Sequence, residues 1–194
     1  GGGRIVITSS ITGPVTGYRG KARLGVKYVD AKGDTLVGFR EKRNSLIADL
    51  AQCEVLIPEV GHRFRDLRAL INGLDCRRRL PQIEVARGDY RHPQADVEMA
   101  FHPSDFTQVN AEINRRMVPL ALDLLEVEAH HQVLDLFCGL GNFTIPAARR
   151  AAGVVGVEAS DAMVRRGYEN ARRNGLENVA FHAWDLDSEP KGQP

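Results

Sequence analysis

Short alternating runs of apolar and polar residues dominate the first part of the chain. Leu24, Val26 and Tyr28 alternate with basic or small residues, which predicts a half-buried strand. The sequence Asp-Ala-Lys-Gly-Asp at 30–34 has the composition of a turn, and the run at 35–40 predicts a returning strand. The two strands and the turn between them predict a β-hairpin.

One helix and two short strands complete the pattern of this part. Pro58 is expected to open the helix, because proline is favoured in the first helical turn. The apolar face of this helix consists of Val60, Phe64, Leu67 and Ile71. The apolar residues at 83–85 and 97–101 predict the two strands.

After residue 100 the pattern changes to alternating helices and strands. Apolar runs at 132–137, 153–158 and 179–181 predict strands, and the first of them suits a central parallel strand. Strands that are separated by helical crossovers imply a doubly wound α/β sheet. The change of pattern predicts two domains, 1–100 and 101–194.

Capping residues mark the helices of this second part. Asn110 is expected to cap one helix and Ser160 another, a third helix is expected from Phe143, and Asn174-Gly175 is expected to end the helix that Ser160 begins. The apolar face of the first helix consists of Ile113, Met117, Leu120, Ala121 and Leu124. That of the last consists of Met163, Val164, Tyr168 and Ala171.

Charge and cysteine content add two expectations. Residues 1–100 carry 17 basic and 12 acidic residues, whereas residues 101–194 carry 9 and 13. A basic front fits a phosphate-facing segment, and it also fits ordinary surface variation. The three cysteines match no zinc or disulfide spacing and no apolar run could cross a bilayer, so a cytoplasmic setting is expected.

The sequence Asp-Leu-Phe-Cys-Gly-Leu-Gly-Asn-Phe at 135–143 follows a predicted strand. Gly139 and Gly141 permit a tight turn and a close approach to a ligand, which in such sheets lies beyond the carboxyl ends of the strands. Glu158 ends the next strand, where a carboxylate accepts hydrogen bonds from both ribose hydroxyls. Asp185 follows the third strand and is placed to meet an adenine amine. The spacing predicts a nucleoside site.

The ligand of this loop is expected to carry positive charge. The third glycine of the dinucleotide fingerprint is missing, because Thr144 stands there. Asp135 suits the ammonium and sulfonium groups of S-adenosylmethionine, whereas a pyrophosphate favours bare amides at a helix N-terminus. We therefore expect S-adenosylmethionine; another nucleotide and a turn without a ligand stay open as alternatives.

Two tracts together carry a family resemblance. The sequence at 135–144 and the sequence Asp-Phe-Thr-Gln-Val-Asn at 105–110 resemble the bacterial RNA 5-methyluridine methyltransferases, in particular those that modify 23S ribosomal RNA. Residues 18–23, 38–40 and 155–158 match as well. The resemblance runs from about residue 11 to the C-terminus. It implies an α/β fold: a partial Rossmann-like S-adenosylmethionine-dependent methyltransferase domain, preceded by a small α+β RNA-facing domain.

The resemblance also implies roles for individual residues. The implied cofactor contacts are Gln108, Asp135, Phe137, Gly139, Gly141, Asn142, Phe143, Glu158 and Asp185. Phe106 is implied beside the entry of the target base. The implied RNA-backbone contacts are Arg19, Lys21, Arg23 and Arg40. Their positive charge supports this role independently of the resemblance. The alternative is that these side chains form a solvated face of a strand.

Covalent catalysis at uracil is the chemistry that the resemblance implies. A cysteine thiolate adds to carbon 6, so that carbon 5 can attack the cofactor methyl, and the base must first leave its stack. The family's nucleophilic cysteine and proton-abstracting glutamate fall beyond Pro194, so no catalytic residue is predicted in this chain. Cys138 is expected to pack as a small hydrophobe rather than act as the nucleophile.

Several departures from the family affect what is expected of this chain. Cys53 resembles the last of four cysteine ligands of a 4Fe-4S cluster, but the other three belong to a segment that this chain lacks, so no cluster is expected. The family's N-terminal barrel is absent, and Asp89 and Tyr90 join segments that relatives separate by an insert. The chain is therefore expected to be a partial member of the family.

Two other functions remain open from the sequence. A non-catalytic RNA-binding module would use only the basic front of the chain. A nucleotide-binding α/β domain would use the glycine loop for a different reaction.

Overall fold

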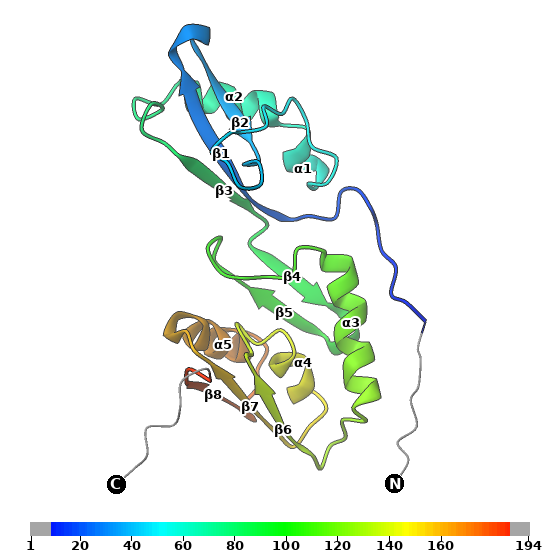
Figure 1. The fold of residues 1–194 in the computed structure, drawn as a ribbon. Coiled ribbons are helices and arrows are strands. Elements are labelled where there is room, and N and C mark those ends of the chain that lie inside the picture. The colour runs from blue at the N-terminus through cyan, green and yellow to red at the C-terminus, as the bar shows by residue number, and fades with distance from the viewer. Residues whose placement is uncertain (1–8, 187–194) are drawn as a thin grey trace, which may run out of the picture.

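Three small β-sheets and their helices follow one another in the computed structural model, which describes residues 9–186 (Figure 1). The first sheet lies at one end of the molecule and a parallel sheet at the other. A hairpin and a long helix lie between them. No helix within residues 9–186 is long and apolar enough to span a membrane.

The first sheet is antiparallel, and its strands are β1 (Lys21–Val29), β2 (Asp34–Gly38) and β3 (Gln82–Ala86) in the order β2-β1-β3. The predicted hairpin is confirmed. A short 3-10 turn, η1 (Asp30–Lys32), joins its strands, and Gly33 closes the turn at a φ of +62°. Leu24 and Val26 point into a core that the following helices cover.

Two helices stand where the sequence predicted one from Pro58. They are α1 (Pro58–Gly61) and α2 (Phe64–Asn72). The carbonyl of Gly61 accepts a hydrogen bond from the N–H of Cys53 at 2.9 Å, so the preceding loop holds the end of α1. A single continuous helix was therefore the wrong prediction, although Phe64 and Ile71 are buried as expected.

A second hairpin consists of β4 (Asp89–His92) and β5 (Val97–Ala100), joined by the 3-10 turn η2 (Pro93–Ala95). The sequence predicted β5 but not β4. The inward residues of β4, Tyr90 and His92, are not aliphatic, so the sequence Asp-Tyr-Arg-His shows no apolar alternation. Val97 and Met99 share a buried cluster with the glycine loop and not with the first sheet. The β4–β5 hairpin therefore packs with the second part of the chain, and the domain division at residue 100 stays a prediction.

The long helix between the sheets is α3 (Ala111–Leu124), and Asn110 caps it as predicted, accepting the N–H of Ile113 at 3.1 Å. Its apolar face was assigned wrongly in part. The fully buried residues are Asn114, Val118 and Leu122, whereas Leu124 is 58% exposed. The buried face of the helix is therefore rotated about the helix axis relative to the face that the apolar pattern indicated.

The parallel sheet contains β6 (Gln132–Leu136), β7 (Gly153–Glu158) and β8 (Val179–Ala183) in the order β6-β7-β8. Among the described strands the central one is β7 and β6 lies at the edge, whereas the sequence predicted a central place for β6. The exposed fractions of Leu134 and Leu136, 61% and 48%, fit an edge position.

Two helices pack on this sheet, α4 (Thr144–Ala148) and α5 (Asp161–Arg173). Ser160 caps α5 as predicted, accepting the N–H of Met163 at 3.4 Å. On α5 the fully buried residues are Gly167, Asn170 and Ala171. Only Ala171 among these was predicted, and Tyr168 is 37% exposed.

Candidate functional site

The glycine loop lies at the carboxyl end of β6 and has a left-handed backbone at three positions. Phe137, Gly139 and Gly141 have φ values of +57°, +58° and +96°. A Cβ atom at Gly141 would lie 2.9 Å from the Ile145 side chain, whereas one at Gly139 would meet nothing within 4 Å. Gly141 thus lets the loop close tightly onto α4, and Gly139 faces open space that a ligand can enter.

Asp135 is the second-last residue of β6, beneath this loop, and is held by Thr144. The Thr144 hydroxyl donates to Asp135 Oδ2 over 2.6 Å. Burial raises the pKa of the Asp135 carboxyl, and the Thr144 hydrogen bonds partly oppose this change. A carboxylate in such a place gains most from a cationic ligand, because the ligand's charge compensates for its desolvation.

Glu158, at the end of β7, contacts the loop directly. Its two carboxylate oxygens accept the N–H groups of Gly139 and Ser160, each at 3.1 Å. The carbonyl of Glu158 accepts the N–H of Trp184, which follows β8. The loop after β6 and the residue after β8 therefore meet at Glu158, whose contact with a ribose stays a prediction.

A second segment, residues 102–109, approaches the glycine loop from β5. Phe106 is 77% exposed and Gln108 is also exposed. A cavity of about 120 Å³ lies between this segment and the loop. Its lining includes the predicted residues Phe106, Gln108, Asp135, Phe137, Gly139, Asn142 and Phe143. The predicted residues Gly141, Glu158 and Asp185 are not part of this lining.

A larger cavity of about 490 Å³ adjoins the first one. Tyr90, Thr107 and Gln108 line both cavities. The larger cavity extends toward the first sheet, where Tyr18, Lys21 and other residues form its wall. These three shared residues therefore lie between the cavity at the glycine loop and the cavity that reaches the first sheet.

Tyr90 and Asn114 are site residues that the sequence analysis missed. The Tyr90 hydroxyl and the Asn114 side-chain N–H both donate to Asn142 Oδ1 at 2.8 Å, and Asn142 donates back to Asn114 over 3.0 Å. Asn142 of the glycine loop is thereby fixed from β4 and from α3. Asn114 could have been found in the sequence, because it is a polar residue one helical turn after the Asn110 cap. The sequence around Tyr90 contains no comparable signal.

Cys138 lies inside the glycine loop and is 5% exposed. Burial, reinforced by the negative charges of Asp135 and Glu158, raises the pKa of its thiol to about 12. The thiol is therefore protonated near neutral pH and is a poor nucleophile. This agrees with the expectation that Cys138 packs as a small hydrophobe.

The predicted RNA contacts gather near the first sheet, and their side chains have partners within the protein. Arg23 pairs with Glu84 at 2.7 Å, and Arg40 donates to the Pro81 carbonyl at 2.9 Å. Arg19 donates to the Lys21 carbonyl, and the Lys21 ammonium donates to the Asp105 carbonyl. Burial lowers the pKa of Lys21, with nearby carboxylates opposing the change. Their contact with RNA stays a prediction.

The cysteines do not assemble a metal site among residues 9–186. Cys53 is half-buried beside α1, Cys76 is exposed, and Cys138 lies in the glycine loop. No described group of three or more His, Cys, Asp or Glu residues could hold a metal ion. Since a 4Fe-4S cluster needs four thiolates, the described donor set does not fit one.

The fold is that of the S-adenosylmethionine-dependent methyltransferases. The profile of the family described as tRNA (Uracil-5-)-methyltransferase matches residues 89–188. The chain therefore belongs to the tRNA (uracil-5-)-methyltransferase family.

Curated relatives of this chain carry a more specific name. It is 57% identical to the 23S rRNA (uracil(1939)-C(5))-methyltransferase RlmD of Alcanivorax borkumensis, in a match that covers 94% of this chain and 54% of the relative. The protein of the same name from Alkalilimnicola ehrlichii is 45% identical, over 97% of this chain and 54% of the relative. The chain thus spans about half the length of the curated relatives it matches.

The first of these matches extends over 238 residues, more than the 194 residues of this chain. The relative therefore has residues within the matched span that this chain lacks, as expected from the sequence. The position of the missing segment, predicted between Asp89 and Tyr90, stays a prediction.

A solved structure supports the fold. The tRNA (uracil-54, C5)-methyltransferase of Pyrococcus abyssi, in complex with S-adenosyl-L-homocysteine, superposes with a TM-score of 0.66 at 17% identity. The match covers 89% of this chain and 56% of that protein. It extends over both the first sheet and the parallel sheet.

Proposed function

We propose that the protein containing this chain transfers a methyl group from S-adenosylmethionine to carbon 5 of a uridine in 23S ribosomal RNA. The chain contributes the cofactor site and a surface that faces the RNA. The observation that carries this proposal is the pair of carboxylates, Asp135 and Glu158, near the carboxyl ends of adjacent parallel strands at one glycine loop. The names of the curated relatives supply the base and the RNA.

The residues around the loop fit the cofactor by their chemistry. Asp135 supplies negative charge to the ammonium and sulfonium end, and Glu158 accepts hydrogen bonds from the ribose hydroxyls. Asp185 is assigned to the adenine amine. S-adenosylmethionine would supply an electrophilic methyl group, and Phe106 and Gln108 line the cavity beside the loop that would hold it.

The open face of the first sheet is assigned to the RNA backbone. Arg23 and Lys27 alternate with the buried residues of β1, so they point away from the helices. Arg23 and Arg40 retain exposed side chains despite their partners within the protein. Cations on such a face neutralise phosphates, and the resulting affinity falls with salt. We assign the reaction to the cytoplasm, where ribosomal RNA is modified.

Titration calorimetry with S-adenosylhomocysteine tests the cofactor assignment on residues 1–194. Binding is expected, and it should be lost or greatly weakened in Glu158→Ala. The exposed Glu177 provides a matched control, because Glu177→Ala removes the same charge outside the site. Absence of binding by the wild-type chain, together with salt-sensitive affinity for RNA, would instead indicate an RNA-binding module.

A methyl-transfer assay tests the substrate. The full-length gene product is incubated with radiolabelled S-adenosylmethionine and unmodified 23S RNA, and the product is examined for 5-methyluridine. Label in another nucleoside, or no label in 23S RNA alongside label in transfer RNA, would overturn the assignment of the substrate. Cofactor binding would survive that result.

A further inference from the structure

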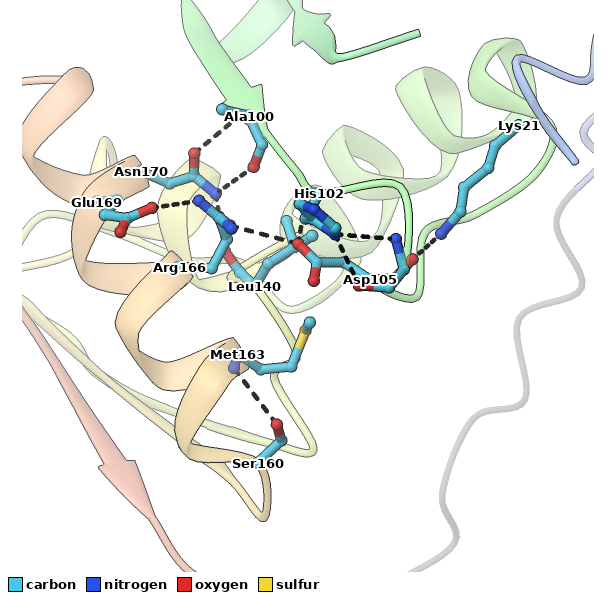
Figure 2. Close-up of polar contacts among 11 residues, drawn as sticks. Lys21, Ala100, His102, Asp105, Leu140, Ser160, Met163, Arg166, Glu169 and Asn170 are labelled. Atoms are coloured by element: carbon cyan, nitrogen blue, oxygen red, sulfur yellow. Dashed lines mark hydrogen bonds and ion pairs between the residues drawn. The ribbon is translucent and has the colours of Figure 1, made fainter. Parts of the chain in front are cut away.

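Asp105 lies at the meeting point of three parts of the molecule. Figure 2 shows it between Lys21, which comes from β1, and Arg166, which comes from α5. It also precedes Phe106, the exposed residue at the mouth of the candidate cofactor cavity. The contacts of Asp105 therefore bear on where the Phe106–Gln108 segment lies.

The segment around Asp105 has little packing of its own. Between Phe101 and Asn110, Asp105 is the only fully buried residue, at 7% exposure, and both Phe106 and Gln108 are exposed. The Asp105 carboxylate accepts the N–H of His102 at 2.7 Å and thereby closes the turn before Phe106. The position of the exposed residues thus depends on how Asp105 is held.

Arg166 holds the carboxylate from the parallel-sheet side. Its Nε lies 3.3 Å from Asp105 Oδ2, and its Nη1 bonds to Glu169 one turn further along α5. The guanidinium is thus oriented by a partner on its own helix (Figure 2). The ion pair is largely removed from solvent, because the exposed fractions of the two side chains are 29% and 9%.

The helix that carries Arg166 is itself bonded to β5 and to the glycine loop. Asn170 exchanges two hydrogen bonds with the backbone of Ala100, at 2.8 and 3.1 Å, and donates to the Leu140 carbonyl of the glycine loop at 3.2 Å. Arg166 and Asn170 lie one turn apart on the same side of α5. The helix therefore sets the distance between the glycine loop and the segment after β5.

A second tie reaches Asp105 from the first sheet. The Lys21 ammonium donates to the Asp105 carbonyl and lies 5.9 Å from the centre of the Phe101 ring. Asp105 thus connects through its backbone to β1 and through its carboxylate to α5.

We propose that Arg166 is a positioning residue that, by pairing with Asp105, holds the Phe106–Gln108 segment over the cofactor cavity. This role deepens the proposed function and rests on it for its link to cofactor binding. Arg166 lines neither cavity of the site, so it acts through the segment and not by touching the cofactor.

Arg165 provides a matched control. It is the neighbouring residue on α5, is exposed, and makes no side-chain hydrogen bond or ion pair among the residues that the structure describes. Arg165→Ala and Arg166→Ala therefore remove the same charge from the same helix, although only Arg166→Ala also breaks a pair with Glu169 on that helix. Only the second variant breaks the contact with Asp105.

Hydrogen exchange measures the segment without any cofactor. Exchange of the amides in residues 102–110 is expected to become several-fold faster in Arg166→Ala and to stay unchanged in Arg165→Ala, because local opening follows the loss of buried contacts. Equal exchange in the two variants would overturn the proposal. This readout holds even if the wild-type chain binds no S-adenosylhomocysteine, a result that would refute the proposed function alone.

A double-mutant cycle tests the route to the cofactor. Arg166→Ala is expected to weaken S-adenosylhomocysteine binding by roughly tenfold, in the range of energetic coupling between connected residues. When Gln108 is already alanine, Arg166→Ala should cause almost no further loss of affinity, because the contact of Gln108 with the cofactor is already gone. Full additivity of the two losses would show that Arg166 acts elsewhere and would overturn its positioning role.

Discussion

The carboxylate of Glu158 and the backbone N–H of Gly139 are joined by a hydrogen bond of 3.1 Å. This contact links the end of β7 to the turn that follows β6. The other carboxylate oxygen accepts the N–H of Ser160. One side chain therefore orders the glycine loop, and the same side chain is assigned to the ribose hydroxyls.

The substitution Glu158→Gln tests both roles of this residue, ordering the loop and binding the ribose, while keeping the size of the side chain. The amide keeps one acceptor oxygen, so one of the two N–H groups loses its partner and the unfolding free energy should fall by about 1 kcal/mol. S-adenosylhomocysteine affinity should fall by roughly tenfold or more, since hydrogen bonds to charged groups are worth about 1.5–3 kcal/mol. Calorimetry and urea unfolding measure the two effects. Glu177→Gln is the control, and equal affinity in both variants would contradict the ribose assignment.

The two glycines of the loop should respond differently to alanine. Gly139→Ala should cost about 1–2 kcal/mol, because its left-handed backbone is strained with a Cβ although the space is open. Gly141→Ala should cost more, because its Cβ would also lie 2.9 Å from Ile145 Cγ1 and 3.2 Å from Phe181 Cζ. Urea denaturation measures both variants. Gly88→Ala, which has open space and no positive φ, should change stability little; a smaller loss at Gly141 than at Gly139 would refute this ranking.

Features that depend on neighbouring residues could be predicted from the sequence. The Asn110 and Ser160 caps each bond to a backbone N–H three residues later, so the pattern of side chains is sufficient. The glycine loop and Glu158 follow likewise from the ends of adjacent strands.

Features that depend on distant partners could not be predicted in this way. The Tyr90 hydroxyl donates to the side chain of Asn142, 52 positions later in the chain. Asn114 can be buried on α3 because its side chain bonds to the same amide. The pairing of Arg166 with Asp105 likewise joins residues 61 positions apart. The sequence also could not show which of β6 and β7 pairs with β8. Both strands are apolar enough to lie at the centre of the sheet, and the pairing of β7 with β8 places β7 there.

Two of the cysteines, Cys76 and Cys138, should differ in reactivity. Cys76 is exposed and should react quickly with iodoacetamide at pH 8, whereas Cys138 is buried with a thiol pKa raised to about 12. Mass spectrometry of time points identifies each labelled peptide, and a Cys76→Ser variant should lose the fast phase. Cys138 should react only when urea unfolds the chain. Fast labelling of Cys138 in the folded protein would contradict its role as a packed hydrophobe.

His92 should make the protein sensitive to mild acid. It is fully buried on β4, with the Tyr90 ring 5.3 Å away. Burial lowers the pKa of the His92 imidazole below its ordinary 6.5, the charge of Arg115 acts in the same direction, and the Asn142 side chain opposes them. Below pH 6.5 the unfolded chain therefore binds a proton that the folded chain does not.

The resulting stability is present above pH 6.5 and is lost as the pH falls toward the folded-state pKa. The greatest slope for one such group is about 1.4 kcal/mol per pH unit. Urea unfolding at pH 7.5, 6.5 and 5.5 should show a steeper decline for the wild-type chain than for His92→Phe, which cannot titrate. His130→Gln, an exposed control, should keep the wild-type slope. Parallel declines in the wild-type chain and His92→Phe would show that acid acts through other groups.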